Sequence, residues 1–161
     1  MAAVSKLACV GRLKNQVALI TGASTGIGRG IALSMAEEEA DVVINFIGDG
    51  KAAHKLVDEI RRKHVRAIAI EADVSDENQV QHMFDKATRE LGAVDILVNN
   101  AGIQKDAVFQ EMTLTDWRKV IDVNLTGAFL CAREAVRGFK KRGIPEGSIT
   151  AGKIIFISSV H

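Results

Sequence analysis

The sequence predicts an α/β protein in which helices cover both faces of a parallel sheet. Three observations predict this class. Five short apolar runs, each bounded by turn residues, are continuous rather than alternating, as in strands that are buried on both faces. Longer segments with the period of an amphipathic helix separate these runs. The resulting alternation of strand and helix, with short connections, is typical of right-handed crossovers between parallel strands.

The strands are predicted from the apolar runs themselves. They occupy residues 17–20, 42–44, 67–70, 96–98 and 154–157. Their uninterrupted apolar character predicts a central sheet with no face open to water.

The first three helices are predicted from apolar residues that recur about once per turn. These residues form three stripes, one in each interval between strands: Ile27, Ile31 and Met35; Leu56, Val57 and Ile60; and Val80, Met83, Phe84, Ala87 and Leu91. In the third predicted helix, charged residues occupy the face opposite the apolar stripe. Each stripe is expected to face the sheet.

The last helix is expected to be the longest. Its pattern runs from about Asp116 to Lys141, with Thr115 as the expected N-cap and basic residues near the C-terminal end. Gly143 and Pro145 are expected to end it.

Composition excludes several classes of protein. The 161 residues are 47% apolar and 25% charged, which is sufficient for a globular core. Twenty-one basic against 20 acidic residues give a net charge of +1, so no electrostatic argument favours nucleic acid or an anionic membrane as a partner. The longest apolar run, 128–132, is too short to span a membrane. Cys9 and Cys131 have no metal-ligand spacing, which predicts free thiols, no metal site and a cytoplasmic location.

A glycine-rich loop follows the first strand. Residues 21–28 read TGASTGIG and lead into the first helix. In this context the N–H groups of a helix N-terminus bind phosphate, and glycine lets the backbone approach the ligand closely. The spacing G-x-x-x-G-x-G differs from both G-x-G-x-x-G and the Walker A motif. The alternative is a tight turn that needs glycine for packing alone.

Three further motifs, taken with this loop, carry a resemblance to a known family. Asn-Asn-Ala-Gly at 99–102 follows the fourth strand, Asp-Val at 73–74 follows the third, and Asn124 lies within VNLTG in the long helix. With TGASTGIG, this set resembles the short-chain dehydrogenase/reductase family over about residues 16–161. The segments NLTGAFL and ISSVH are most similar to glucose 1-dehydrogenase-like members.

The resemblance implies a Rossmann-like, doubly wound parallel sheet with strand order 3-2-1-4-5. Residues 1–15 would then be a lead-in to an incomplete NAD(P)-binding domain at 16–161. The cofactor would be NAD or NADP. The residues implied to surround its phosphates and ribose are Gly22, Ser24, Thr25, Gly26, Ile27 and Gly28. Asp73 and Val74 are implied to contact the adenine, and Asn100, Ala101 and Gly102 to lie along the nicotinamide side.

Some of these residues have structural alternatives. Asp73 can instead cap a turn at a strand end. Asn99 is expected to tie adjacent strands together, and Arg29 is interpreted as a helix-surface residue. The second strand ends in Asn-Phe-Ile-Gly at 45–48, without the acidic residue typical of NAD binding or the arginine typical of NADP binding. The choice between the two cofactors therefore stays open.

Asn124 and Ser159 are the candidate catalytic residues. An asparagine inside a helix lowers helix stability, and the resemblance implies that Asn124 distorts the helix and frees a carbonyl to hold a water. The alternative is a buried polar residue whose hydrogen bonds are satisfied. Ser159, at the end of the fifth strand, would hydrogen-bond the substrate oxygen, whereas a serine pair at that place is otherwise typical of a turn.

The family also uses a tyrosine, in a Y-x-x-x-K motif after that serine, to transfer the proton. The lysine lowers the pKa of this tyrosine. The sequence contains no tyrosine and ends two residues after Ser159. We therefore expect a chain truncated before the motif and inactive alone, from an NAD(P)-dependent oxidoreductase of alcohols, sugars or ketones. The alternatives are a non-catalytic nucleotide-binding remnant and a gene fragment.

Truncation after the fifth strand has expected structural consequences. The fifth strand becomes an exposed edge and the fourth loses cover on one face. Apolar residues of the long helix lack part of their packing, namely Trp117, Val120, Ile121, Ala128 and Phe139. We expect the isolated chain to be poorly soluble or partly molten. The complete family member is expected to be a homo-oligomer that acts on a small-molecule substrate.

Overall fold

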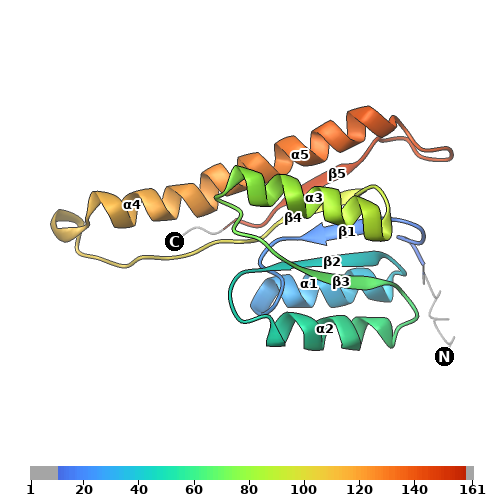
Figure 1. Cartoon of the computed structure of the whole chain (residues 1–161), viewed down its shortest axis with the longest axis horizontal. Coiled ribbons are helices and arrows are strands. Elements are labelled where there is room, and N and C mark those ends of the chain that lie inside the picture. Colours follow the sequence, from blue (N-terminus) through green and yellow to red (C-terminus); the bar gives the residue numbers. More distant parts are fainter. Residues whose placement is uncertain (1–10, 159–161) are drawn as a thin grey trace, which may run out of the picture.

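The fold is built on a five-stranded parallel sheet. The computed structural model describes residues 11–158. The strands are β1 (Val17–Ile20), β2 (Asp41–Phe46), β3 (Ala67–Glu71), β4 (Ile96–Asn99) and β5 (Lys153–Phe156). Their order in the sheet is β3-β2-β1-β4-β5, and every pairing is parallel, as predicted (Figure 1). The predicted strands agree with these bounds to within two residues.

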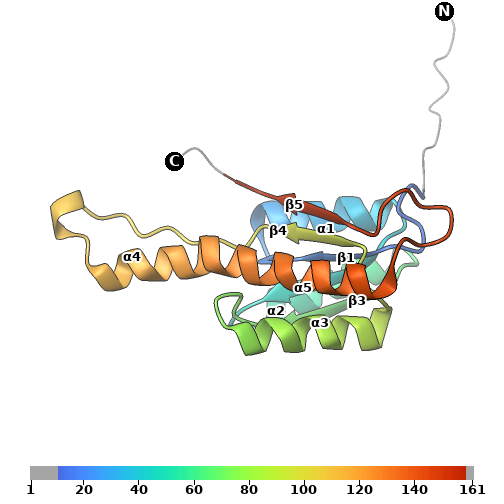
Figure 2. The ribbon, with the colours of Figure 1, turned by 90° about the horizontal axis from the view of Figure 1, so that it is seen from above.

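Helices cover both faces of this sheet. On one face lie α1 (Gly26–Glu37) and α2 (Lys51–Arg61), and on the other lie α3 (Glu77–Leu91) and α5 (Gly127–Arg142), as Figures 1 and 2 show. Successive side chains of one strand point to opposite faces, so Ala18 and Ile20 join the core under α1 and α2 while Val17 and Leu19 join the core under α3 and α5. The continuous apolar runs arise because each strand contributes to both cores.

The second and third predicted stripes are buried, whereas the first lies beside the buried face of its helix, where Ile31 and Met35 pack half-buried against the core. The buried residues of α1 are Gly28, Ala32 and Ala36, whereas Ile27 is 67% exposed and Ile31 is half-buried. Small side chains let this helix lie close to the strands. Residue size, which hydrophobic periodicity does not take into account, therefore decided which residues of α1 are fully buried.

The long predicted helix is divided into three consecutive parts, and a separate 3-10 helix lies before them. A short 3-10 helix (Phe109–Glu111) precedes α4 (Leu114–Ile121), a π-helical turn (Asp122–Thr126) follows, and α5 then continues to Arg142. The expected N-cap, Thr115, is wrong: it lies inside α4, and the Thr113 hydroxyl accepts the hydrogen bond from the Asp116 N–H at 3.1 Å. The helix ends as predicted at Gly143, whose φ of +78° suits glycine.

Two of the expected packing losses do not occur. All of β4 is buried, because its Leu97 packs under α5 while Ile96 and Val98 join the core on the α1 face. Phe139 is also buried, at 8% exposure, in the core beneath α3 and α5. Side chains from both layers thus close over β4 without further elements.

Other packing losses are present as expected. In β5 the side chains of Ile155 and Phe156 are exposed, and Ile157, just beyond the strand, is 36% exposed. Trp117 on α4 is 54% exposed, and Val120, Ile121 and Ala128 are half-buried. Within residues 11–158, no helix has the length and apolar character that crossing a bilayer requires.

Candidate functional site

The glycine loop between β1 and α1 has a backbone that requires glycine. Gly22 and Gly26 have φ angles of +61° and +56°, in the left-handed region that side chains disfavour. A Cβ on Gly22 would lie 3.0 Å from the Ala101 Cα, and one on Gly28 would lie 2.5 Å from the Asn100 Nδ2. The loop is therefore pressed against the segment that follows β4. Glycine is therefore needed here for packing, and the same loop conformation is compatible with phosphate binding.

The N-terminus of α1 opens beside this loop. Its N-cap, Thr25, makes no side-chain capping hydrogen bond, and the first turn holds no acidic residue. Thr25, Gly26 and Ile27 are exposed. The N–H groups at this end of the helix thus face outward with the positive end of the helix dipole, where they can bind an anion.

Thr21 connects the ends of β1 and β4. Its hydroxyl accepts hydrogen bonds from the N–H groups of Asn100 and Ala101, both at 2.9 Å, and donates to the Val98 carbonyl at 3.3 Å. The Asn100 amide donates to the Thr21 carbonyl at 2.8 Å. These partly buried hydrogen bonds between the two strand ends hold the glycine loop and the Asn-Asn-Ala-Gly segment together.

Asn45 connects the same loop to β2 and β3. Its Oδ1 accepts from the Gly22 N–H at 3.1 Å, and its Nδ2 donates to the Ala72 carbonyl at 2.9 Å. Asn45 and Thr21 are both buried, and sequence reasoning assigned neither to the site. The signal that could have found them is a polar residue at the end of an otherwise apolar strand, a place that demands a hydrogen-bond partner.

A cleft of about 420 Å³ lies at the carboxyl ends of the strands. Its lining includes six of the predicted cofactor residues: Gly22, Asp73, Val74, Asn100, Ala101 and Gly102. It also includes Asn45, Phe46 and Ile47 from the end of β2, and Lys119 and Val123 from the long helical segment. The other predicted cofactor residues, Ser24, Thr25, Gly26, Ile27 and Gly28, lie in the adjoining loop and in the first turn of α1.

Asp73 at this cleft forms a turn. Its Oδ1 accepts from the Ser75 N–H at 2.9 Å and from the Ser75 hydroxyl at 2.7 Å, while its own N–H donates to the Gln79 side chain. These hydrogen bonds match the structural interpretation of Asp73 as a turn-forming carboxylate. Because Asp73 also lines the cleft, the turn positions this carboxylate beside any ligand bound there.

Asn124 lies in the π-helical turn and holds a distant loop. Its Oδ1 accepts from the Ile103 N–H at 2.8 Å, and its Nδ2 donates to the Ile103 carbonyl at 3.0 Å. The Gly127 N–H bonds to the Asp122 carbonyl five residues earlier, so the helix is locally widened at this residue. The alternative of a buried core asparagine is wrong, because Asn124 is exposed. Single π-turns of this kind occur often at functional sites.

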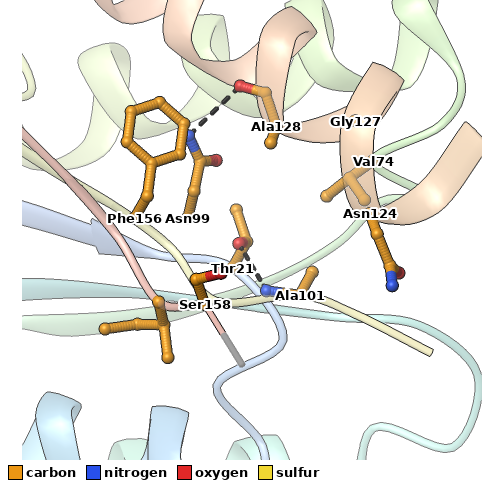
Figure 3. A pocket seen from close by; sticks show the side chains of 10 residues that line it. Thr21, Val74, Asn99, Ala101, Asn124, Gly127, Ala128, Phe156 and Ser158 are labelled. Atoms are coloured by element: carbon orange, nitrogen blue, oxygen red, sulfur yellow. Dashed lines mark hydrogen bonds between the residues drawn. The ribbon is translucent and has the colours of Figure 1, made fainter. Parts of the chain in front are cut away.

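A second, smaller cavity of about 130 Å³ lies between this π-turn and the end of β5 (Figure 3). Its lining includes Thr21, Asn124 and Ser158. Asn99 also lines it, and its Nδ2 donates to the Ala128 carbonyl of α5 at 3.1 Å. The expectation that Asn99 ties adjacent strands is therefore wrong: this side chain ties β4 to α5. Ser159, the candidate catalytic serine, lies outside the described residues.

Two further groups, Cys131 and Arg29, lie in structural surroundings. Burial raises the pKa of the Cys131 thiol to about 12, which keeps it protonated and unreactive at neutral pH. Arg29, interpreted from the sequence as a helix-surface residue, forms an ion pair with Glu59 at 2.6 Å between α1 and α2. Across residues 11–158, no three His, Cys, Asp or Glu side chains gather in a group that could hold a metal ion.

Comparison with known proteins identifies relatives along most of the chain. A family model described as short chain dehydrogenase matches residues 16–161. Glucose 1-dehydrogenase 2 of Bacillus subtilis (strain 168) is 39% identical over 150 residues, covering 92% of this chain and 56% of that protein. The 3-oxoacyl-(acyl-carrier-protein) reductase FabG of Staphylococcus aureus (strain Mu50 / ATCC 700699) is 41% identical over 143 residues, covering 89% and 55%. The chain thus spans about half the length of these relatives.

Solved structures show the same relationship. A short-chain type dehydrogenase/reductase from Mycobacterium marinum superposes with a TM-score of 0.83 at 39% identity, over 91% of this chain and 57% of that one. A short chain dehydrogenase from Burkholderia cenocepacia J2315, solved in complex with NADP, superposes with a TM-score of 0.82 at 35% identity, over 92% and 57%.

Proposed function

Because this chain belongs to the short-chain dehydrogenase family, we propose that it holds a nicotinamide cofactor, NAD or NADP, in the cleft at the carboxyl ends of its strands. The observation that carries the proposal is the place of the glycine loop. In the order β3-β2-β1-β4-β5, the chain reverses direction across the sheet between β1 and β4. Open α/β sheets bind ligands at such a switch point. The glycine loop and residues 99–102 flank this point, joined by the hydrogen bonds of Thr21 and Asn100.

The residues present fit a dinucleotide. The outward N–H groups of α1, together with Gly22, Ser24 and Thr25, would hold the pyrophosphate. Asp73 and Val74 would contact the adenine, and residues 100–102 the nicotinamide ribose. Glycine at 22 and 28 lets the loop pack against residues 100 and 101, since a Cβ at either place would collide with them. When bound, the nicotinamide would give or accept a hydride.

Two residues, Asn124 and Ser159, would act where the substrate binds. Asn124 would keep the loop at Ile103 in place and maintain the π-turn, whose widened backbone leaves a carbonyl able to hold a water. Ser159 would hydrogen-bond the oxygen of an alcohol, sugar or ketone. The complete family member would act as a homo-oligomer.

Proton transfer would need a group that the 161 residues lack. They contain no tyrosine, whose phenol would carry the proton in the family's reaction. We therefore propose that this chain alone binds cofactor without turnover, which is the behaviour of a nucleotide-binding remnant. Oxidation of glucose or another alcohol by the purified chain, lost in Ser159→Ala, would contradict this part of the proposal.

Cofactor binding is tested directly with the chain's single tryptophan. Trp117 is partly exposed on α4, and energy transfer from it to NADH reports binding. We expect saturable binding, weakened at least about tenfold in Gly22→Ala, because a side chain at that φ would strain the loop. Gly138→Ala is the matched control, since a Cβ there meets nothing within 4 Å. An absence of binding at millimolar NADH would refute the proposal.

A further inference from the structure

Resting on this proposed function, we infer that the cleft selects NAD(H) over NADP(H), and that Glu71 is the residue that discriminates between them. The two cofactors differ by a phosphate on the 2′ position of the adenosine ribose. In dinucleotide-binding folds an acidic residue about 20 positions after the glycine loop binds the free 2′-hydroxyl, whereas an arginine accommodates the 2′-phosphate. Here β2 ends in Asn45 and Phe46, followed by Ile47, so neither group comes from the end of this strand.

The structure supplies an acidic group at this place from the neighbouring strand. Glu71 is the last residue of β3, and the sheet register pairs it with Phe46, the last residue of β2. Its Oε1 accepts a hydrogen bond from the Gly48 N–H at 3.3 Å. The carboxylate of Glu71 is therefore tethered to the turn that directly follows Ile47, a lining residue of the cleft. Its position corresponds to that of the acidic residue that the C-terminal end of β2 lacks.

The charges around this turn favour the same choice. Asp49 and Asp73 add two further carboxylates, and residues 21–28 contain no basic residue. Arg29 pairs with Glu59 at 2.6 Å, and Lys51, whose side chain is 90% exposed, pairs with Asp49 at 3.4 Å. Lys119, the basic residue in the lining of the cleft, comes from α4 rather than from this turn. A doubly charged 2′-phosphate bound here would be repelled by these carboxylates, and the β2–α2 turn would offer it no unpaired cation.

Family membership alone does not decide this choice, since the structure from Burkholderia cenocepacia is a complex with NADP. The inference depends on Glu71 and its tether. Repulsion between one partly solvated carboxylate and a 2′-phosphate is expected to weaken NADPH binding about tenfold relative to NADH. The difference should shrink as salt is raised, because exposed charges are screened.

The experiment measures the dissociation constants of NADH and NADPH for the purified chain and for Glu71→Gln. We expect NADH to bind about tenfold more tightly to the unmodified chain, and the preference to fall to about twofold or less in Glu71→Gln through tighter NADPH binding. Glu146→Gln is the matched control. It removes the same charge from an exposed residue beside Lys14 and Asn15, at the opposite end of the sheet, and should keep the preference.

The outcomes separate the inference from the function on which it rests. Equal binding of the two cofactors, or a preference unchanged in Glu71→Gln, would overturn the role of Glu71 and leave cofactor binding intact. A preference reduced equally by Glu146→Gln would also overturn it, because net charge alone would then explain the effect. If neither cofactor binds, both the inference and the proposed function fail.

Discussion

At the scale of single residues, close approach between backbone segments shapes the glycine loop beside the cleft. Gly28 lies where the first turn of α1 meets both the glycine loop and Asn100. The sequence motif indicated that glycine is needed in this region. The contact partners, Asn100 from beyond β4 and the Gly22 carbonyl from the loop, are seen only in the fold.

A comparison of two glycines of α1 tests this contact. In Gly28→Ala the new Cβ would lie 2.5 Å from the Asn100 Nδ2, so we expect a loss of about 1–3 kcal/mol in the free energy of unfolding. Gly30→Ala is the control: its Cβ meets nothing within 4 Å, and alanine should stabilise the helix by about 0.5–1 kcal/mol. Urea unfolding of both variants measures the difference. Equal shifts in the two would show that no tight contact exists at Gly28.

At the scale of elements, helix ends were harder to predict than helices. Threonines occupy both 113 and 115, and either could have capped α4. The cap belongs to Thr113 because its hydroxyl bonds to the Asp116 N–H and its backbone remains extended. The sequence predicts only a helix distortion near Asn124. The hydrogen bonds of the Asn124 side chain to Ile103 join segments 21 residues apart, so local sequence patterns do not indicate them.

The N-cap of α3 is a testable pH-dependent element. The Asp76 Oδ1 accepts from the N–H groups of Asn78 and Gln79, and its Oδ2 accepts from the Gln79 side chain. The hydrogen bond from the Gln79 N–H, followed by that from its side chain, lowers the pKa of Asp76 below its ordinary 3.8. A lowered pKa means that this stabilisation is present above about pH 3.8 and is lost as the pH falls through the lower, folded-state value.

We therefore expect Asp76→Ala to lower the Tm at pH 7, with the difference from the unmodified chain shrinking below about pH 4. Asp76→Asn is the control, because asparagine also caps helices but does not titrate. Its Tm should stay close to that of the unmodified chain at pH 7. Thermal unfolding followed by circular dichroism from pH 2 to 7 measures both, and a pH-independent difference for Asp76→Ala would rule out the titrating cap.

At the scale of the whole molecule, the sheet is well covered except along β5. Both faces of β1 and β4 are buried, but β5 presents Ile155 and Phe156 at an edge. Within residues 11–158, β5 pairs with β4 alone. An exposed apolar edge strand is a template for pairing with another chain.

We expect the isolated chain to self-associate through this edge, and Ile155→Lys to reduce the association by placing a charge on it. Ile149→Lys is the control, since Ile149 is 95% exposed in the loop before β5 and the change adds the same charge away from the strand. Light scattering after size-exclusion chromatography at matched protein concentrations measures both. A monomeric unmodified chain, or equal improvement by the two variants, would contradict edge pairing.

The sequence by itself determined the parallel α/β sheet, the order of its elements and the need for glycine after β1. These features depend on periodicity, on continuous apolar runs and on backbone conformation, all of which are local. The tertiary structure decided which residues of α1 are fully buried, that β4 is covered on both faces, that Asn45 lines the cleft, and that Thr21 and Glu71 bond to segments beside it. Each of these depends on partners that only the sheet register brings together, since a side chain's burial and hydrogen bonds are set by residues distant along the chain.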